Sequence, residues 1–136
     1  TLFRESDVVS IHLQLSDRTR GLVGAHEIRL MQSTSYLVNI SRGPIVDEAA
    51  LVQALRQRSI AGAGLDTFDV EPLPLDHPFL KLNNTVITPH LGYVTQESYE
   101  AFYNGVIENI NAFVGGEPIR VINPEVLESP QVRSPR

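Results

Sequence analysis

The sequence predicts an α/β protein with a parallel sheet. Three short apolar runs each end on a reactive side chain, namely Arg42, Asp66 and His90. The intervals are 24 residues each (66 − 42 and 90 − 66), which fits one strand and one crossover connection per interval. Short apolar runs that alternate with helical patterns favour parallel strands buried on both faces. We therefore expect the three side chains to meet at the carboxyl edge of one sheet, where open α/β sheets bind ligands.

The strands of this sheet are predicted in chain order. Residues 6–13 form a β-branched apolar run, and the runs at residues 35–40, 61–65 and 84–88 follow it. The expected parallel strands end near Leu13, Ile40, Leu65 and Thr88. Helices should cross between at least two of these strands.

Three helices are predicted from apolar periodicity and end signals. Residues 25–31 form a short amphipathic helix. The next helix has Asp47 as its N-cap and ends near Ser59, and Glu48 in its first turn suits the helix dipole. The last helix covers residues 95–114 and stops at Gly115-Gly116. Its apolar stripe contains Tyr99, Phe102, Tyr103, Val106, Ile110 and Phe113.

The composition is that of a globular domain. The chain has 136 residues, of which 42% are hydrophobic and 20% charged, so it is about one domain long. No apolar stretch approaches the ~20 residues of a membrane span and no signal-like segment opens the chain, so a cytoplasmic location is expected. A net charge of −5 without a Lys/Arg cluster argues against nucleic acid as a partner. We expect a small-molecule or protein partner instead.

The sequence favours neither disulfides nor a metal site. It contains no cysteine, which excludes thiolate nucleophiles and Cys-rich zinc sites. The four histidines lack the i, i+4 spacing of metal ligands. His12 lies within an apolar run, so a hydrogen-bonded histidine of the core or rim is a better interpretation than a catalytic one.

The residues at the predicted sheet edge allow two interpretations. An Arg, an Asp, a Glu and a His at strand ends could form ordinary ion pairs on a rim. Alternatively, a guanidinium can bind a planar carboxylate through two hydrogen bonds, and a His beside a Glu is a tuned proton donor. A carboxylate near a flat ring can accept a hydrogen bond from an amide. Together these groups suit the reduction of a polarised carbonyl beside a nicotinamide.

Three motifs at these positions carry a family resemblance. They are Asn-Ile-Ser-Arg-Gly-Pro-Ile-Val-Asp at residues 39–47, Gly-Leu-Asp-Thr-Phe-Asp-Val-Glu-Pro at residues 64–72 and Thr-Pro-His-Leu-Gly at residues 88–92. In this order and spacing they resemble the C-terminal signatures of the D-isomer-specific 2-hydroxyacid dehydrogenases. Residues 6–13 resemble the preceding strand, so the similarity covers roughly residues 1–115. The implied fold is the C-terminal part of a Rossmann-like, doubly wound parallel sheet.

The resemblance implies a role for each residue at the edge. Arg42 would hold the carboxylate and carbonyl oxygen of the substrate, and His90 would donate a proton to the carbonyl as hydride arrives. Glu71 would pair with His90, because a carboxylate beside an imidazole favours its protonated form. Asp66 would bind the nicotinamide carboxamide or stabilise its charge. The cofactor, NAD or NADP, would contact Leu13, Ile40, Ser41, Arg42, Asp66, His90 and Gly92, although Leu13 and Ile40 also suit a plain core role.

The chain also departs from the family pattern. Gln14 stands where the family usually has Pro, and Tyr93 and Val94 replace small residues, so the substrate class does not transfer. No G-x-G-x-x-G motif follows a strand, and the N-terminal sequence that builds most of the family's substrate domain is missing. We expect a piece of a larger protein. Residues 1–116 would be the C-terminal half of a nucleotide-binding domain, and residues 117–136 a loose tail.

The main functional hypothesis is an NAD- or NADP-dependent 2-hydroxyacid dehydrogenase, present as a fragment that is inactive alone. Its substrate would be a small 2-keto or 2-hydroxy acid, and the intact protein would be a homodimer. The alternative is a non-catalytic nucleotide-sensing or protein-interaction module on the same scaffold, as in relatives that act as corepressors. An unrelated flavodoxin-like binding domain would require all three motif matches to be accidental.

Overall fold

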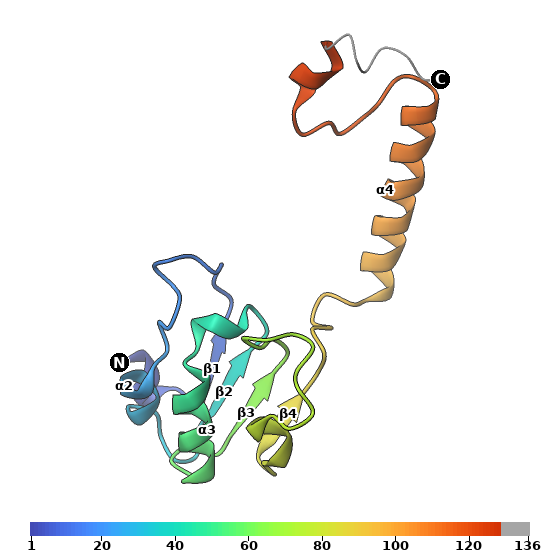
Figure 1. The fold of residues 1–136 in the computed structure, drawn as a ribbon. Coiled ribbons are helices and arrows are strands. Elements are labelled where there is room, and N and C mark those ends of the chain that lie inside the picture. Colours follow the sequence, from blue (N-terminus) through green and yellow to red (C-terminus); the bar gives the residue numbers. More distant parts are fainter. Residues whose placement is uncertain (129–136) are drawn as a thin grey trace. The chain divides into compact units, whose positions relative to one another are not determined.

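A computed structural model describes residues 1–128, and the chain forms two compact units, residues 1–92 and a second unit that begins at Tyr93 (Figure 1). The first unit contains, in order, α1 (Leu2–Glu5), β1 (Val8–Ile11), α2 (Ala25–Arg29), β2 (Tyr36–Asn39), η1 (Gly43–Ile45), α3 (Glu48–Arg56), β3 (Gly62–Leu65), η2 (Pro78–Lys81) and β4 (Thr85–Ile87). Strands and helices therefore alternate as predicted.

The first unit is built on a four-stranded sheet with the order β1-β2-β3-β4, and every neighbouring pair is parallel. The register aligns the last residues of the strands, with Ile11 beside Asn39, Asn39 beside Leu65 and Leu65 beside Ile87. These ends lie within two residues of the predicted ones. The predicted fold class is confirmed, and the carboxyl ends of all four strands share one edge.

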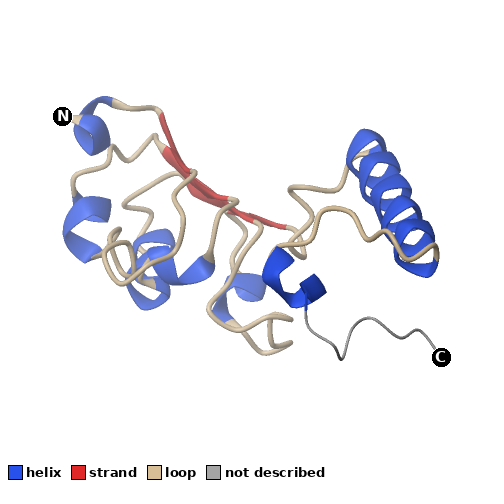
Figure 2. Cartoon of the chain, turned by 90° about the horizontal axis from the view of Figure 1, so that it is seen from above, coloured by secondary structure: helices blue, strands red, loops and turns tan. Residues whose placement is uncertain are grey.

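Helices α2 and α3 make the crossovers from β1 to β2 and from β2 to β3, and they contact each other. The N-cap prediction for α3 is confirmed, since Oδ1 of Asp47 accepts a hydrogen bond from the N–H of Ala50 at 3.0 Å. Helix α3 ends at Arg56, three residues before the predicted end at Ser59. In Figure 2, which views the sheet nearly edge-on, both crossover helices lie on one side of it.

The core lies between the sheet and these two helices. Its most deeply buried side chains include Leu37, Ile45, Leu51, Leu55, Ile60 and Phe79. The prediction that the strands are buried on both faces is wrong for the described residues, because Val8, Tyr36 and Val86 on the opposite face are exposed. Strands β1 and β2 alternate between buried and exposed or partly exposed residues, since both crossover helices cover the same face.

The second unit contains α4 (Gln96–Val114) and η3 (Pro124–Glu128). The hydroxyl oxygen of Thr95 caps α4 by accepting a hydrogen bond from the N–H of Ser98 at 3.2 Å, and the helix ends at Val114, just before Gly115, as predicted. The predicted apolar stripe of α4 is exposed throughout. Residues 129–136 of the predicted tail lie outside the described residues, and the domain boundary at residue 116 stays a prediction. None of the helices within residues 1–128 has the length and apolar character needed to cross a membrane.

Candidate active site

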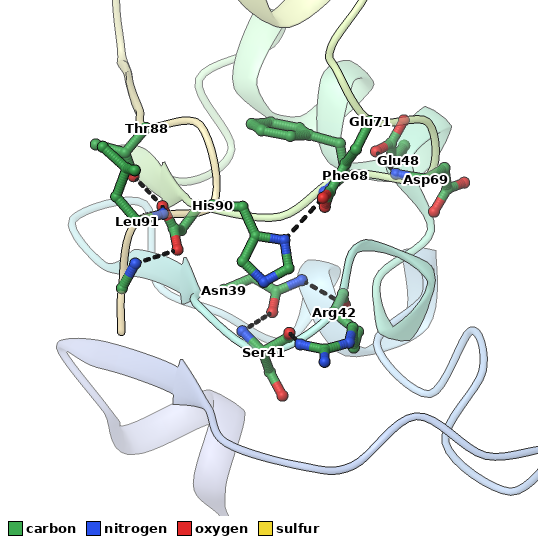
Figure 3. Close-up of polar contacts among 12 residues, drawn as sticks. Asn39, Ser41, Arg42, Glu48, Phe68, Asp69, Glu71, Thr88, His90 and Leu91 are labelled. Carbon is green, nitrogen blue, oxygen red and sulfur yellow. Dashed lines mark hydrogen bonds and ion pairs between the residues drawn. The ribbon is translucent and has the colours of Figure 1, made fainter. Parts of the chain in front are cut away.

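The residues predicted to act together gather at the carboxyl edge of the sheet. Leu13 follows β1, residues 40–42 follow β2, Asp66 follows β3 and residues 88–92 follow β4. Glu71 comes from the loop after β3. Figure 3 shows Arg42, Glu71 and His90 grouped around this edge. The convergence expected from the 24-residue intervals is therefore present in the fold.

The turn after β2 is fixed by Asn39, the last residue of that strand. Its Nδ2 donates to the carbonyl of Arg42 at 2.9 Å, and its Oδ1 accepts from the N–H of Ser41 at 3.1 Å. The side chain is buried, so these bonds are shielded from water and hold the turn that presents Arg42. Sequence reasoning did not assign Asn39 a site role, although a polar residue ending an apolar run was visible.

Leu13, Ile40 and Ser41 border the ends of β1 and β2. The hydroxyl of Ser41 donates to the carbonyl of Leu13, which ties the two strand ends together. The side chains of Leu13 and Ile40 are 46% and 44% exposed, so they are not plain core residues. Exposed apolar side chains at this edge offer a surface for a flat ring, which suits the nicotinamide end of a dinucleotide.

Arg42 is exposed, and its guanidinium donates to the carbonyl of Ser41 at 2.7 Å. Five N–H donors in a planar fork leave the group able to bind a carboxylate as well. Its positive charge helps to lower the pKa of Glu71, which places the guanidinium within electrostatic reach of that carboxylate. Arg42 thus lies near His90, the predicted proton donor, as the sequence suggested (Figure 3).

His90 and Glu71 form the closest pair at the edge, with Nδ1 of His90 2.7 Å from Oε2 of Glu71. The other oxygen of Glu71 accepts from the N–H of Phe68 at 2.9 Å, so the carboxylate is oriented by its own loop. Burial acts to raise the pKa of Glu71, but the hydrogen bonds from His90 and Phe68 and the charges of His90 and Arg42 lower it overall. Glu71 is therefore ionised beside the imidazole at neutral pH.

Asp66 holds the turn that carries His90. It is buried, and it accepts hydrogen bonds from the hydroxyl of Thr88 at 2.5 Å and from the N–H groups of Leu91 at 2.8 Å and Gly92 at 2.7 Å. Burial acts to raise the pKa of this carboxyl, and these three bonds together with the charge of His90 lower it overall. The sequence did not predict these three hydrogen bonds, because the spacing of Asp66 and His90 does not show how the turn between Thr88 and Gly92 folds back onto Asp66.

The backbone of His90 has a φ of 58°, in the left-handed region that few side chains adopt. Asp66 accepts hydrogen bonds from Thr88 before His90 and from Leu91 after it, and these bonds maintain the conformation of His90. The predicted contact of Asp66 with a nicotinamide carboxamide stays a prediction. An ionised carboxylate can accept about four hydrogen bonds, so three partners leave room for one more.

Gly92 adjoins the other residues expected to contact a cofactor. A Cβ atom at this position would lie 3.0 Å from Oδ2 of Asp66 and 3.8 Å from Cβ of Ile40. The absence of a side chain keeps the space beside Ile40 open. These residues fit the nicotinamide end of NAD or NADP, whereas the chain contains no G-x-G-x-x-G turn for the pyrophosphate.

A cavity of about 500 Å³ lies beside the acid pair. Glu71 and His90 line it, and apolar side chains, among them Phe68, Leu73 and Leu80, form much of the remaining wall. The cavity can therefore hold a small organic molecule next to the His90–Glu71 pair, and Arg42 is not among its lining residues. Within residues 1–128, no group of three or more His, Asp or Glu side chains is placed to hold a metal ion.

Comparisons with known proteins identify a family that the chain resembles over most of its length. The family described as "D-isomer specific 2-hydroxyacid dehydrogenase, NAD binding domain" matches residues 1–92. Over 98% of its length the chain is similar to 39% of the glyoxylate reductase of Aeropyrum pernix, with 46% identity. The chain spans about two fifths of the length of the curated relatives it matches.

The chain is also similar to solved structures of dehydrogenases. A candidate D-3-phosphoglycerate dehydrogenase oxidoreductase from Ralstonia solanacearum has a TM-score of 0.85 and 37% identity, over 97% of this chain and 39% of that one. A D-isomer specific 2-hydroxyacid dehydrogenase from Xanthobacter autotrophicus Py2, solved with NADPH and MES, has a TM-score of 0.68 and 38% identity, over 87% of this chain and 48% of that one.

Proposed function

Because the chain belongs to the D-isomer-specific 2-hydroxyacid dehydrogenase family and matches its NAD-binding domain, we propose that it carries the catalytic residues of an NAD- or NADP-dependent 2-hydroxyacid dehydrogenase. The proposed reaction interconverts a small 2-keto acid and the corresponding 2-hydroxy acid. The observation that carries this proposal is the 2.7 Å pair of His90 and Glu71 with Arg42 close by. A polarised proton donor beside a guanidinium is what carbonyl reduction in a carboxylic acid requires.

Each residue has a separate task in this proposal. The guanidinium of Arg42 binds the substrate carboxylate and orients the neighbouring carbonyl. His90, held through Nδ1 by Glu71, donates the proton on Nε2 to the carbonyl oxygen. Glu71 stabilises the imidazolium before the transfer and orients the ring throughout.

The nicotinamide of the cofactor, when bound, supplies the hydride that the carbonyl carbon accepts. Leu13, Ile40, Ser41 and Gly92 would hold that end of the cofactor, and Asp66 would accept a hydrogen bond from its carboxamide. The keto acid gains one hydride and one proton and becomes the hydroxy acid, so the reaction balances. The imidazole that results regains its proton from water.

Reduction of glyoxylate and hydroxypyruvate with NADH or NADPH by the full protein tests the proposal. His90→Ala should lower kcat by roughly 10²- to 10⁴-fold, the range for a positioned general acid. His26→Ala, on the exposed surface of α2, should leave the rate unchanged. Cofactor binding without any keto-acid reduction would instead favour the non-catalytic nucleotide-sensing module.

The same proposal includes a homodimer, by analogy with the family, and the cytoplasmic location expected from the sequence. It also holds that the 136-residue chain alone lacks useful dehydrogenase activity, because no Gly-rich turn for the cofactor pyrophosphate is present in its sequence. Light scattering of the full protein tests the first point, and turnover by the chain itself tests the last.

A further inference from the structure

The loop between β3 and η2 carries Glu71, and much of it is not held by the core. Asp69 and Val70 are exposed, and Leu75 is 95% exposed. A segment that burial does not fix depends on particular hydrogen bonds for its position. Whatever makes those bonds also determines where Glu71 stands relative to His90.

Glu48, in the first turn of α3, bonds to both sides of this loop. Its Oε1 accepts a hydrogen bond from the N–H of Asp69 at 2.8 Å, and its Oε2 lies 3.3 Å from Nε2 of His77. The side chain is only 19% exposed, which limits the competition from water. Figure 3 shows Glu48 beside Asp69, close to Glu71. One carboxylate therefore clamps the segment that contains the partner of His90.

The contact with His77 is directional. Nδ1 of His77 accepts from the N–H of Phe79 at 3.3 Å, so this nitrogen carries no proton in the arrangement observed. The ring proton is then on Nε2, which donates it to Glu48. The clamp thus consists of two donors from the loop that meet the two oxygens of one carboxylate.

Helix α3 does not need Glu48 as a cap. Asp47 already accepts from the N–H of Ala50 at 3.0 Å, and this bond satisfies one of the free donors at the helix start. The bonds of Glu48 to Asp69 and His77 both leave the helix and reach the loop. The side chain is therefore used to connect two elements of the sheet edge.

We propose that Glu48 is a positioning residue for the His90–Glu71 pair. It acts through the loop and does not touch the substrate. The inference rests on the function proposed above, since it gives Glu48 a part in the same proton transfer. If the loop shifts, Glu71 no longer meets Nδ1 of His90 at 2.7 Å, and the proton donor loses its orientation.

Steady-state kinetics of the full protein with Glu48→Ala and Glu48→Gln provide the first test. Glu48→Ala should lower kcat by roughly 10- to 100-fold, up to the scale expected for a misplaced catalytic group, and should change KM much less because Arg42 is intact. Glu48→Gln should recover part of the loss, since its amide oxygen can still accept from Asp69. Asp47→Ala is the matched control, because it removes a cap from the same helix start and should leave kcat unchanged.

A double-mutant cycle separates positioning from a general loss of stability. If Glu48 acts through Glu71, adding Glu48→Ala to Glu71→Gln should lower kcat no further than Glu71→Gln alone. Fully additive effects on kcat would overturn the proposal, because they would mean that Glu48 acts independently of the pair.

Amide hydrogen exchange gives a result that does not depend on activity. Exchange at Phe68 and Asp69 should speed up in Glu48→Ala and stay at the parent rate in Asp47→Ala. Unchanged exchange at both residues in Glu48→Ala would overturn the inference even in an active enzyme. If the parent protein reduces no keto acid, the proposed function fails, and the exchange measurement still decides whether Glu48 holds the loop.

Discussion

The backbone of Gly43 lies directly against the backbone of Phe68. A Cβ atom at position 43 would be 2.0 Å from the carbonyl carbon of Phe68 and 2.3 Å from its oxygen, distances that no side chain can adopt. The contact joins the turn that presents Arg42 to the loop that presents Glu71. The separation of the two charged groups is therefore set by direct contact between two backbones.

Gly43→Ala should break this contact and destabilise the first unit by about 1 to 3 kcal/mol, the usual cost of overpacking. The backbone must move, because the atoms in the way belong to the main chain and not to a flexible side chain. Urea unfolding of the variant and the parent measures the loss. Gly64→Ala is the matched control, since its Cβ would meet only Val38 at an ordinary 3.8 Å. Equal stability of the two variants would contradict this explanation.

Glu71→Gln should lower kcat/KM for keto-acid reduction at neutral pH and should weaken its decline toward acidic pH. Burial acts to raise the pKa of Glu71, but its partners lower it overall, so the carboxylate is ionised across the neutral range and is protonated only below its ordinary value of 4.5. In the parent the carboxylate that pairs with Nδ1 of His90 is therefore lost only in acid, whereas the amide of Gln does not titrate. Measurement of kcat/KM against pH for both proteins checks both effects. Superimposable profiles would remove Glu71 from the proton transfer.

The sequence was sufficient for the four parallel strands and their approximate ends, because apolar runs at regular intervals indicate strands joined by crossovers. It was not sufficient for the burial of each face. Val8 and Tyr36 are apolar members of strand-like runs, yet both are exposed, because burial depends on what covers the sheet and not on the strand itself.

The site residues that directly follow a strand could be predicted from the sequence. Contacts between elements that are far apart in the sequence could not. Arg42, Asp66 and His90 could be placed at a common edge from their spacing. The role of Glu48 could not, since the first turn of a helix accounts for its charge and Asp69 lies 21 residues away. Hydrogen bonds between loops of such separation follow from the packing of elements, which local patterns do not encode.

Asp66→Asn should destabilise the protein near neutral pH by about 1.5 to 3 kcal/mol, the range for hydrogen bonds to a charged group. An amide cannot accept from Leu91 and Gly92 with both of its ends, so one N–H of the turn would face another donor. The pKa of Asp66 is lowered on folding from its ordinary 3.8, so its stabilising contribution is complete above that pH and disappears as the pH falls below it.

Urea unfolding at neutral and acidic pH checks this dependence. The difference in unfolding free energy between the parent and Asp66→Asn should be complete near neutrality and should shrink as the pH falls below 3.8. Asp7→Asn, which replaces an exposed carboxylate beside β1, serves as the control and should show little difference at either pH. A constant difference across this range would show that ionisation of Asp66 does not contribute.

The last prediction concerns cofactor affinity of the 136-residue chain itself. Its edge offers Leu13, Ile40 and Gly92 to a nicotinamide, but its sequence has no G-x-G-x-x-G turn to bind the pyrophosphate. Charge-assisted hydrogen bonds contribute about 1.5 to 3 kcal/mol each. Losing two or three of them is enough to account for the ~4 kcal/mol that separates micromolar from millimolar affinity. Calorimetric titration with NADH and NADPH should therefore give dissociation constants in or above the millimolar range. Micromolar binding by the chain would mean that its own residues supply an anion site of another kind.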